Sequence, residues 1–456
     1  MWIHWQKDSK MRTLVLFCVV AVWTLPPAWA DDIAPINAPE NDFAAQLMEG
    51  AIKLAPLTHR VWSENDLLRL SANSDAAPAI AIRRLLLGQQ APEARSVSAF
   101  SLLTAENEPR LAWRLSGVYS VGRDADLVYV ADTTRSFVEQ RPQMPWLYAA
   151  QLRVYTPIGE WRIGQSPIRW GGGYSGALLL SDNPPPLLHV DYRAAWYLGR
   201  LLQTWRFEQM AAIFTENGER RYLMARRLRR ELSPQWEISL AEAFKASKLP
   251  YGATAFILPF YLYQYIFTWQ LYDRNDDWFN YMAEVQVKYR LGDQKLYFNL
   301  LLDDIQAPRW LTRFRYTTPR KSGFLVGYQV PLRNSGQLVV EVAHTDGDPG
   351  GGVYNYKNPA NRWVYRNAVL GHPTGTNRDM LWLRLDLPLT DRTYLVVEHS
   401  NTRRANATPA VPVEKAWSVQ LHWMLQKEYS LGVRWQQHIA HDQHTNRWIL
   451  QLGRLF

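Results

Sequence analysis

Residues 159–187 read GEWRIGQSPIRWGGGYSGALLLSDNPPPL, and this stretch decides how the rest of the chain is interpreted. Trp161 and Ile163 alternate with Arg162, as in a strand that has one apolar and one polar face. The glycines at 171–173 are predicted to adopt backbone angles that side chains forbid, and the prolines that follow turn the chain. The stretch therefore predicts a strand, a long shaped loop and a returning strand. The alternative is that this stretch is a Gly- and Pro-rich connector with no functional role.

The same two-residue period continues from about residue 95 to the end of the sequence. It predicts an all-β barrel of about 18 antiparallel strands in which tight turns alternate with long connections, as in outer-membrane barrels. A soluble β-sandwich or propeller is the weaker alternative, because the sequence has no blade repeat. The long connections are predicted at 168–187, 246–276, 304–319, 346–377 and 403–413. The predicted strands are 95–105, 112–122, 126–135, 146–155, 159–167, 188–198, 201–211, 219–230, 235–245, 277–290, 294–303, 320–331, 335–345, 378–388, 392–402, 414–425, 429–440 and 444–456.

The N-terminal part of the sequence has a different organisation. Residues 1–30 are predicted to be an export signal, with a basic start, an apolar core and a cleavage site after Ala30, and Met11 is an alternative start to Met1. Residues 31–94 carry apolar side chains at helical spacing and are predicted to form a small helical domain, followed by the barrel at 95–456. No later segment offers the roughly 20 uninterrupted apolar residues of a spanning helix. The mature protein is therefore expected to be secreted, periplasmic or a barrel.

Composition favours the barrel and bounds the partners. The chain has 21 Trp and 23 Tyr, as expected where aromatic girdles lie at both membrane interfaces. Its net charge of +9 suits acidic polysaccharide or lipid headgroups, and nucleic acid is not expected as a partner outside the cell. The one cysteine, Cys18, lies in the predicted signal, which excludes disulfides and thiolate chemistry from the mature chain.

Three motifs give the chain a family resemblance. They are R-W-G-x-G-Y-x-G at 169–176 with the Leu-rich run and prolines after it, FNLLLDDIQ at 298–306, and YRNAVLGHPTGTNRD at 365–379. In this order they resemble the capsule-assembly (Wzi-type) outer-membrane family, over most of the chain after the signal. The resemblance implies a transmembrane barrel with a periplasmic helical bundle at residues 31–94. It also implies a surface lectin that attaches or organises capsular polysaccharide or exopolysaccharide in the outer membrane.

Catalytic patterns are weak, so we expect no enzyme, no metal and no cofactor. Ala177 stands where the nucleophile elbow of hydrolases needs glycine. Asp303 and Asp304 are consecutive strand residues and should point to opposite faces, which does not suit paired carboxylate catalysis. Histidines recur three residues apart at 438–444, but a surface loop explains them better than a metal site does.

Aromatic rings and planar polar groups in the long connections are predicted to bind glycan, because rings stack on sugars and guanidinium groups pair with carboxylates. A diffusion porin is the alternative function, although the arginines of 219–230 and the helical domain should obstruct the lumen. A monomer in contact with outer-membrane lipid is expected in either case. The predicted glycan-binding residues are Arg169, Trp170, Tyr174, Arg309, Trp310, Arg313, Tyr354, Tyr356, Trp363, Tyr365, Arg366 and His372.

Overall fold

The structure is a computed structural model that describes the barrel strands and part of their connections. The predicted signal peptide and helical domain lie outside the described residues and stay predictions. No helix among the described residues is long and apolar enough to cross a membrane. The described ranges are 96–105, 108–120, 125–132, 147–156, 159–198, 202–233, 235–249, 279–292, 294–303, 321–332, 336–347, 352–356, 359–390, 393–405, 413–426, 429–440 and 443–455.

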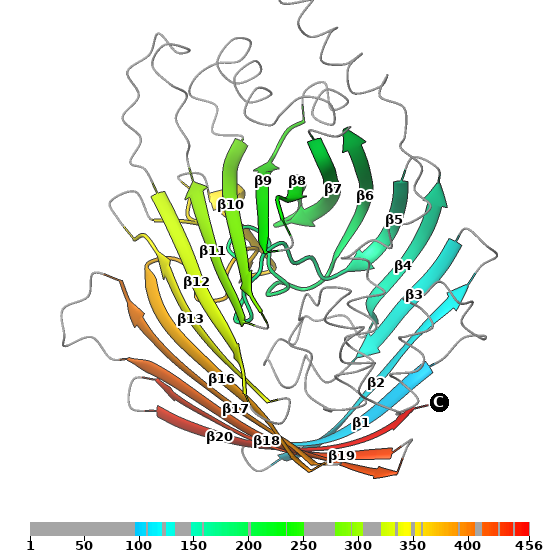
Figure 1. The fold of residues 1–456 in the computed structure, drawn as a ribbon, viewed down its shortest axis with the longest axis vertical. Coiled ribbons are helices and arrows are strands. Elements are labelled where there is room, and N and C mark those ends of the chain that lie inside the picture. The colour runs from blue at the N-terminus through cyan, green and yellow to red at the C-terminus, as the bar shows by residue number, and fades with distance from the viewer. Residues whose placement is uncertain are drawn as a thin grey trace, which may run out of the picture.

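An 18-stranded antiparallel sheet closes on itself as a barrel, because its first strand pairs with its last as well as with its neighbour in sequence (Figure 1). The predicted all-β barrel and its strand number are confirmed. Closure satisfies the backbone groups of every strand without an open edge. The strands are β1 Ser96–Ala105, β2 Glu108–Ser120, β3 Ala125–Asp132, β4 Leu147–Thr156, β5 Gly159–Ser166, β6 Leu187–Leu198, β7 Leu202–Glu216, β8 Glu219–Glu231, β9 Trp236–Ala246, β10 Phe279–Leu291, β11 Gln294–Asp303, β12 Lys321–Pro331, β13 Gln337–Thr345, β16 Arg378–Thr390, β17 Thr393–Arg404, β18 Glu414–Gln426, β19 Tyr429–Ala440 and β20 Gln443–Leu455.

Strand direction separates the connections into two sets at opposite ends of the barrel. At one end every connection is short: 121–124, 157–158, 199–201, 232–235, 292–293, 332–336, 391–392 and 427–428. The five connections predicted to be long all leave the other end. Long loops are extracellular in outer-membrane barrels, so this end is called the extracellular mouth below.

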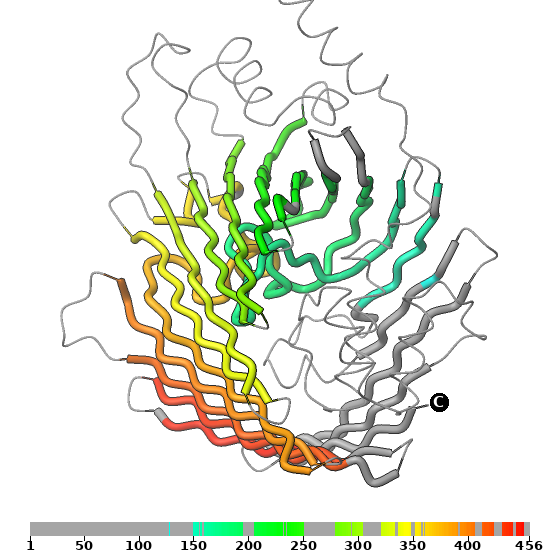
Figure 2. The backbone as a smooth tube through the Cα atoms, viewed as in Figure 1, coloured from blue at the N-terminus to red at the C-terminus, as the bar shows by residue number. Residues whose placement is uncertain are grey.

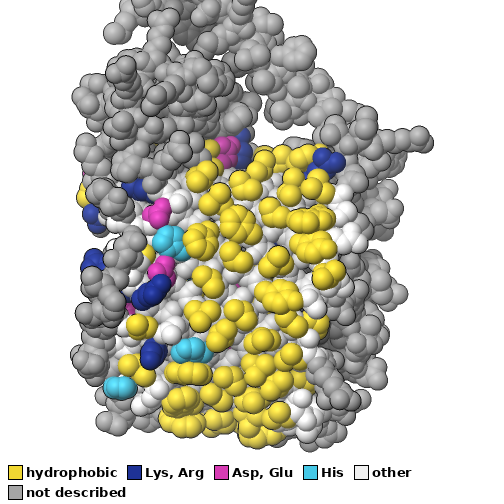
Figure 3. Space-filling view, turned by 60° about the vertical axis from the view of Figure 1, so that its left-hand side comes forward, with side chains coloured by type: hydrophobic (Ala, Val, Ile, Leu, Met, Phe, Trp, Pro, Cys, Tyr) yellow, Lys and Arg dark blue, Asp and Glu magenta, His cyan; other side chains and the backbone are white. Residues whose placement is uncertain are grey.

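Side chains alternate between an apolar outer face and a polar lumen, as predicted from 159–187. In β5, Trp161 and Ile163 face outward and are 37% and 49% exposed, whereas Arg162 faces the lumen and is fully buried. Val342 of β13 and Leu381 of β16 continue the apolar outer surface. Figure 3 shows hydrophobic side chains covering this face of the barrel. Such a surface suits contact with lipid.

The arginines of β8 alternate between the two faces of the strand. The prediction that they lie in the lumen wall is therefore correct only for those on the inner face. The lumen-facing ones are Arg221, Arg227 and Arg229, which are buried. On the other face Arg226 lies 3.4 Å from a carboxylate oxygen of Glu242. The Arg230 guanidinium lies 5.1 Å from the centre of the Trp205 ring. These contacts offset the cost of placing cations outside the polar lumen.

Candidate functional site

Two of the long connections fold into the barrel and pack against each other there. They are residues 167–186, between β5 and β6, and the described residues of 346–377, between β13 and β16; together we call them the plug. Figure 2 shows the segment after β5 lying inside the ring of strands. Within the second connection, β14 Val364–Tyr365 and β15 Ala368–Val369 form a small hairpin, preceded by the 3-10 turn η3 Pro359–Asn361.

The Leu-rich run forms the centre of the plug. Leu178 and Leu179 are fully buried, and their carbonyl oxygens accept hydrogen bonds from the Tyr354 hydroxyl at 2.6 Å and Trp363 Nε1 at 2.8 Å. The backbone N–H of Ser181 donates to the carbonyl oxygen of Leu370 at 2.6 Å. These hydrogen bonds matter because a buried backbone group without a partner would cost free energy inside the barrel.

Glycines let the two connections of the plug approach each other. A Cβ on Gly371 would lie 2.4 Å from the Leu178 carbonyl oxygen, and one on Gly176 would lie 2.4 Å from Pro373 Cδ. Within the first connection, a Cβ on Gly171 would lie 2.6 Å from the Ala177 Cβ. The prediction that glycines 171–173 adopt angles forbidden to side chains is wrong, since none of the three has a positive φ. Close packing is the reason for glycine at these positions.

The plug is fastened to the lumen wall of β9–β13 by buried polar groups. The Glu341 carboxylate of β13 accepts hydrogen bonds from the backbone N–H groups of Tyr174 and Ser175, the second at 2.7 Å, and from the Tyr297 hydroxyl. Lys245 Nζ of β9 donates to the carbonyl oxygens of Arg362 and Val364 at 3.0 and 2.8 Å. Both Glu341 and Lys245 are fully buried. Charged groups therefore hold the plug by its backbone.

Opposite charges are paired where the wall of β7 and β8 meets the plug. The Glu208 carboxylate lies 2.7 Å from Arg227 Nη2 and 3.2 Å from Arg229 Nη2. Arg227 also lies 5.2 Å from the centre of the Trp170 ring, so a wall cation covers a ring of the plug. This part of the lumen is filled by packed and ion-paired side chains.

Most of the predicted glycan-binding residues lie inside the plug. Five of them are buried, because the connections fold inward: Trp170, Tyr354, Trp363, Tyr365 and His372. Arg169, Tyr174 and Tyr356 are half-buried, and Arg366 is exposed at the turn of the β14–β15 hairpin. Residues Arg309, Trp310 and Arg313 lie outside the described residues. A role in glycan binding stays a prediction for all of them.

Burial also sets the protonation of two plug residues. Burial, with a smaller contribution from nearby Arg169, lowers the pKa of His372 to about 3, so the ring is neutral at physiological pH. Its Nε2 lies 3.2 Å from the Ser175 hydroxyl and its Nδ1 lies 2.8 Å from the Thr374 hydroxyl. Burial raises the pKa of Tyr354, which keeps its hydroxyl as a hydrogen-bond donor. Both side chains are therefore uncharged hydrogen-bonding groups of the plug.

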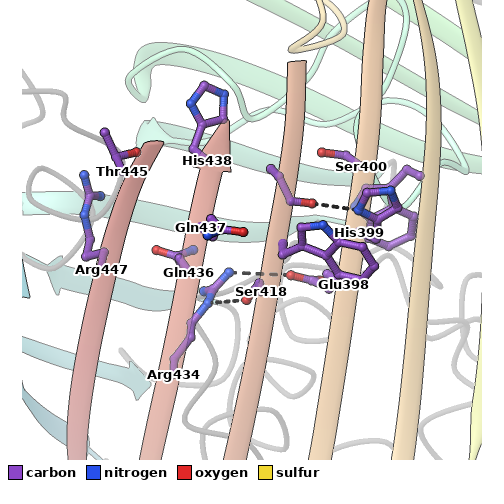
Figure 4. Close-up of a pocket in the computed structure, with 13 residues that line it drawn as sticks. Glu398, His399, Ser400, Ser418, Arg434, Gln436, Gln437, His438, Thr445 and Arg447 are labelled. Carbon is purple, nitrogen blue, oxygen red and sulfur yellow. Dashed lines mark hydrogen bonds and ion pairs between the residues drawn. The ribbon is translucent and has the colours of Figure 1, made fainter. Parts of the chain in front are cut away.

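A polar hollow of about 320 Å³ lies in the wall of β16–β20, and we call it the lumen hollow. Most of its lining residues occupy lumen-facing positions of their strands. Figure 4 shows that they come from neighbouring strands. His438 is exposed, whereas Arg434 is buried. The hollow is lined by Trp382, Glu398, His399, Ser400, Ala416, Trp417, Ser418, Arg434, Gln436, Gln437, His438, Thr445 and Arg447.

Charged groups of three strands meet at the base of the lumen hollow. Arg434 Nε donates to the Ser418 hydroxyl at 2.8 Å, and Arg434 Nη2 lies 3.5 Å from a Glu398 oxygen (Figure 4). The other Glu398 oxygen lies 3.1 Å from Arg384 Nη1, and Arg384 in turn binds Asp386 at 2.9 Å. The network holds the Arg434 guanidinium in one place at the wall of the hollow.

Sequence reasoning missed the lumen hollow, and of its lining histidines it considered only His438, as part of a metal site. Its residues are spread over five strands, so no local motif joins them. The available signal was alternation: Ser418 and Arg434 are polar residues flanked on both sides by apolar ones, as at lumen-facing positions of a barrel strand.

Comparisons with known proteins agree with this architecture. The family model described as "Capsule assembly protein Wzi" matches residues 155–445, which is more than half of the chain. The structure of Wzi from Escherichia coli, described as an outer membrane protein involved in group 1 capsule assembly and a carbohydrate-binding β-barrel, has 13% identity and a TM-score of 0.58. The alignment covers 91% of this chain and 98% of that one.

A second solved structure is more distant. OpdK of Pseudomonas aeruginosa, an outer membrane protein, has 12% identity and a TM-score of 0.47, over 80% of this chain and 98% of its own. A structural similarity this low does not support any conclusion about function. No curated protein sequence matches the chain. The match of the family model, together with the closed barrel, places the chain in the outer membrane as a member of the Wzi capsule-assembly family.

Proposed function

We propose that this barrel attaches or organises capsular polysaccharide or exopolysaccharide at the cell surface, as a lectin that does not transform it. Membership of the capsule-assembly family is the observation that carries the proposal. The Escherichia coli neighbour, described as carbohydrate binding, supports the same partner class. The proposal includes a monomeric barrel in contact with outer-membrane lipid, consistent with its apolar outer face.

The chemistry of the lumen side supports binding rather than catalysis. A carboxylate that serves as acid or base must be within reach of the substrate, and two buried carboxylates beside the plug, Glu341 and Asp303, already hold backbone groups. Glu341 binds the N–H groups of Tyr174 and Ser175, and Asp303 accepts the N–H of Tyr354 at 3.1 Å. Polar side chains of the lumen hollow lie near the extracellular mouth, where a surface polymer would meet the barrel.

The plug argues against the diffusion porin. A porin needs a continuous aqueous path, whereas residues 167–186 lie inside the barrel and pack against its wall. We expect little conductance from the intact protein in planar bilayers. Large, steady single-channel currents would contradict a closed lumen and favour the porin function.

Capsule retention on cells tests the proposed function. Cells lacking the protein should release polysaccharide into the medium while total polysaccharide stays unchanged, and the cloned chain should restore the cell-bound fraction. Barrel abundance in the outer membrane is measured in the same cultures. Unchanged retention without the protein, or an equal fall in total polysaccharide, would contradict attachment.

A further inference from the structure

We propose that His344 is a proton-operated clasp at the root of the plug, where its charged ring joins the two ends of the second connection and its neutral ring lets them part. The root is the place where residues 346–377 leave β13 and return to β16. The inference concerns how the plug is held, so it stands apart from the proposed attachment of polysaccharide. Three features of the root support it: its position, the contacts of both ring nitrogens and the balance of charge.

His344 lies beside both ends of the second connection. It is the last residue but one of β13, and the connection begins at Asp346. Its partner across the sheet is Asp379, the second residue of β16, where the connection has just ended. Both side chains point to the outer face, because Val342 and Leu381, two positions along the same strands, are exposed there. A single side chain can therefore hold both ends.

Both ring nitrogens of His344 meet carboxylates. Nδ1 lies 2.6 Å from an oxygen of Asp379, and Nε2 lies 3.0 Å from an oxygen of Asp346. A neutral imidazole has one N–H group, so only the doubly protonated ring can donate both hydrogen bonds. The geometry at the root is therefore that of an imidazolium held between two carboxylates.

The second oxygen of each carboxylate also has a donor. Asp346 Oδ2 accepts from the backbone N–H and the hydroxyl of Ser322 at 2.9 and 2.6 Å, and Asp379 Oδ2 lies 3.1 Å from Arg403 Nε. Burial alone would raise the pKa of Asp346, but hydrogen bonds from Ser322 and His344 outweigh it and hold that pKa below its ordinary value. The proton that completes the network therefore belongs to the ring.

The charges at the root balance only when the ring is charged. Asp346 faces it from the connection and Asp379 faces it from β16, where Asp379 also pairs with Arg403 of β17. From β12, Phe324 stacks on the imidazole at 5.2 Å and 28°. Loss of one proton would leave the group with a net negative charge and would turn a nitrogen lone pair towards a carboxylate oxygen. Both changes push a carboxylate away from His344.

Release of the ring would act on the start of the connection. The backbone N–H of Asp346 donates to the Ser322 carbonyl oxygen at 2.9 Å, and the Asp346 carbonyl oxygen accepts from the N–H of Val353 at 3.1 Å. A carboxylate that leaves the ring moves this backbone with it. On the lumen side the Thr345 hydroxyl, which does not titrate, donates to the Gly375 carbonyl oxygen at 2.8 Å. The connection should therefore loosen at Asp346 and Val353 while the centre of the plug stays docked.

Amide hydrogen exchange of the purified full-length protein in detergent tests the clasp at about pH 6 and about pH 9, on either side of the range in which histidine titrates. Each rate is divided by the chemical exchange rate at the same pH. Protection of the Asp346 and Val353 amides should fall about tenfold at the higher pH, since a charge-assisted hydrogen bond is lost. The Ser181 amide, at the centre of the plug, should keep its protection.

Three variants assign the effect to His344. His344→Gln cannot change its charge, so its protection should be the same at both pH values. Asp379→Asn leaves the ring one carboxylate, so its loss of protection should begin at a lower pH than in the wild type. His444→Gln removes an exposed histidine of β20 and should keep the wild-type profile. Heat-modifiable migration checks that each barrel is folded, and if His344→Gln does not fold, the profile of Asp379→Asn decides.

Four outcomes would overturn the proposal. They are equal protection of the wild type at both pH values, an equal fall at the Ser181 amide, a wild-type profile in His344→Gln and an unshifted profile in Asp379→Asn. Retention of polysaccharide by cells is measured separately, so a failed clasp leaves the attachment function standing.

Discussion

Removal of the Glu341 side chain should release the plug from the barrel wall. Glu341 is fully buried, and its two oxygens accept hydrogen bonds from the N–H groups of Tyr174 and Ser175 and from the Tyr297 hydroxyl. The first two donors belong to the plug backbone and cannot turn towards another partner without moving the loop. Glu341→Ala therefore leaves donors buried and without an acceptor.

The size of the effect follows from those bonds. An orphaned buried donor costs about 1–3 kcal/mol, so two orphaned N–H groups should weaken docking of the plug by roughly 3 kcal/mol. At about 1.4 kcal/mol per factor of ten, the population with an undocked plug should rise by roughly a hundredfold. Glu341→Gln keeps one acceptor oxygen and presents an NH2 group to the other donors, so its effect should be smaller, about 1–3 kcal/mol.

Trypsin cleavage after Arg169 reports the undocked population. Arg169 lies in the plug, and its Nη1 is 3.4 Å from Asp182. Proteolysis follows the population of the open form when reclosing is fast relative to cleavage. The cleavage rate should therefore rise in the order wild type, Glu341→Gln, Glu341→Ala. Glu237→Gln is the matched control, because that lumen carboxylate binds Lys288 of the wall at 2.8 Å. Equal cleavage rates in the wild type and Glu341→Ala, or an equal rise in the control, would refute the reasoning.

Three further predictions concern the plug and the N-terminus. The pKa of His372 is about 3 in the folded protein and 6.5 in the unfolded chain. As the pH falls from 7 to 5 the unfolded chain takes up a proton and the folded protein does not, so the free energy of unfolding should fall by roughly 2 kcal/mol. His372→Asn should reduce the fall in heat-modification midpoint over that range, and an unchanged fall would contradict the assignment. Trp363→Ala should cost about 3–5 kcal/mol, seen as a lower midpoint, whereas Arg366→Gln at the exposed turn should leave it unchanged. Cleavage after Ala30 should give an intact mass that begins at Asp31; any other N-terminus would contradict the predicted site.

Strands were predictable from the sequence because a barrel strand repeats a physical constraint at every second residue. The predicted bounds of β11 and β19 agree with the structure at both ends. Alternation in β5 also placed Trp161 outward and Arg162 in the lumen. Other boundaries were less accurate: β2 begins four residues before its predicted start, and β7 ends five residues after its predicted end.

The direction of the long connections was not predictable from local pattern. Trp170 and Trp363 lie in connections, as predicted, but nothing in their local sequence indicates that both are buried in the lumen. A fully apolar run such as Leu178–Leu180 is the one local sign of burial, because an exposed loop gains nothing from three leucines. The partners of that run, Tyr354 and Trp363, are far away in sequence, so only the fold could reveal them.

Closure and recognition are assigned to different arcs of the barrel, and this division makes them separable by mutation. The plug is fastened to the wall of β9–β13, where Glu341 and Lys245 hold its backbone. The lumen hollow lies in the wall of β16–β20, where Arg434 adds positive charge. Trp382 lines the hollow and stacks on Tyr174 of the plug, so it is the contact through which one arc could affect the other. If the arcs act independently, Glu341→Ala should open the plug without lowering the cell-bound fraction of polysaccharide, and Arg434→Gln should lower that fraction without opening the plug. A loss of both properties in each variant would instead mean that the plug is a wall of the binding site.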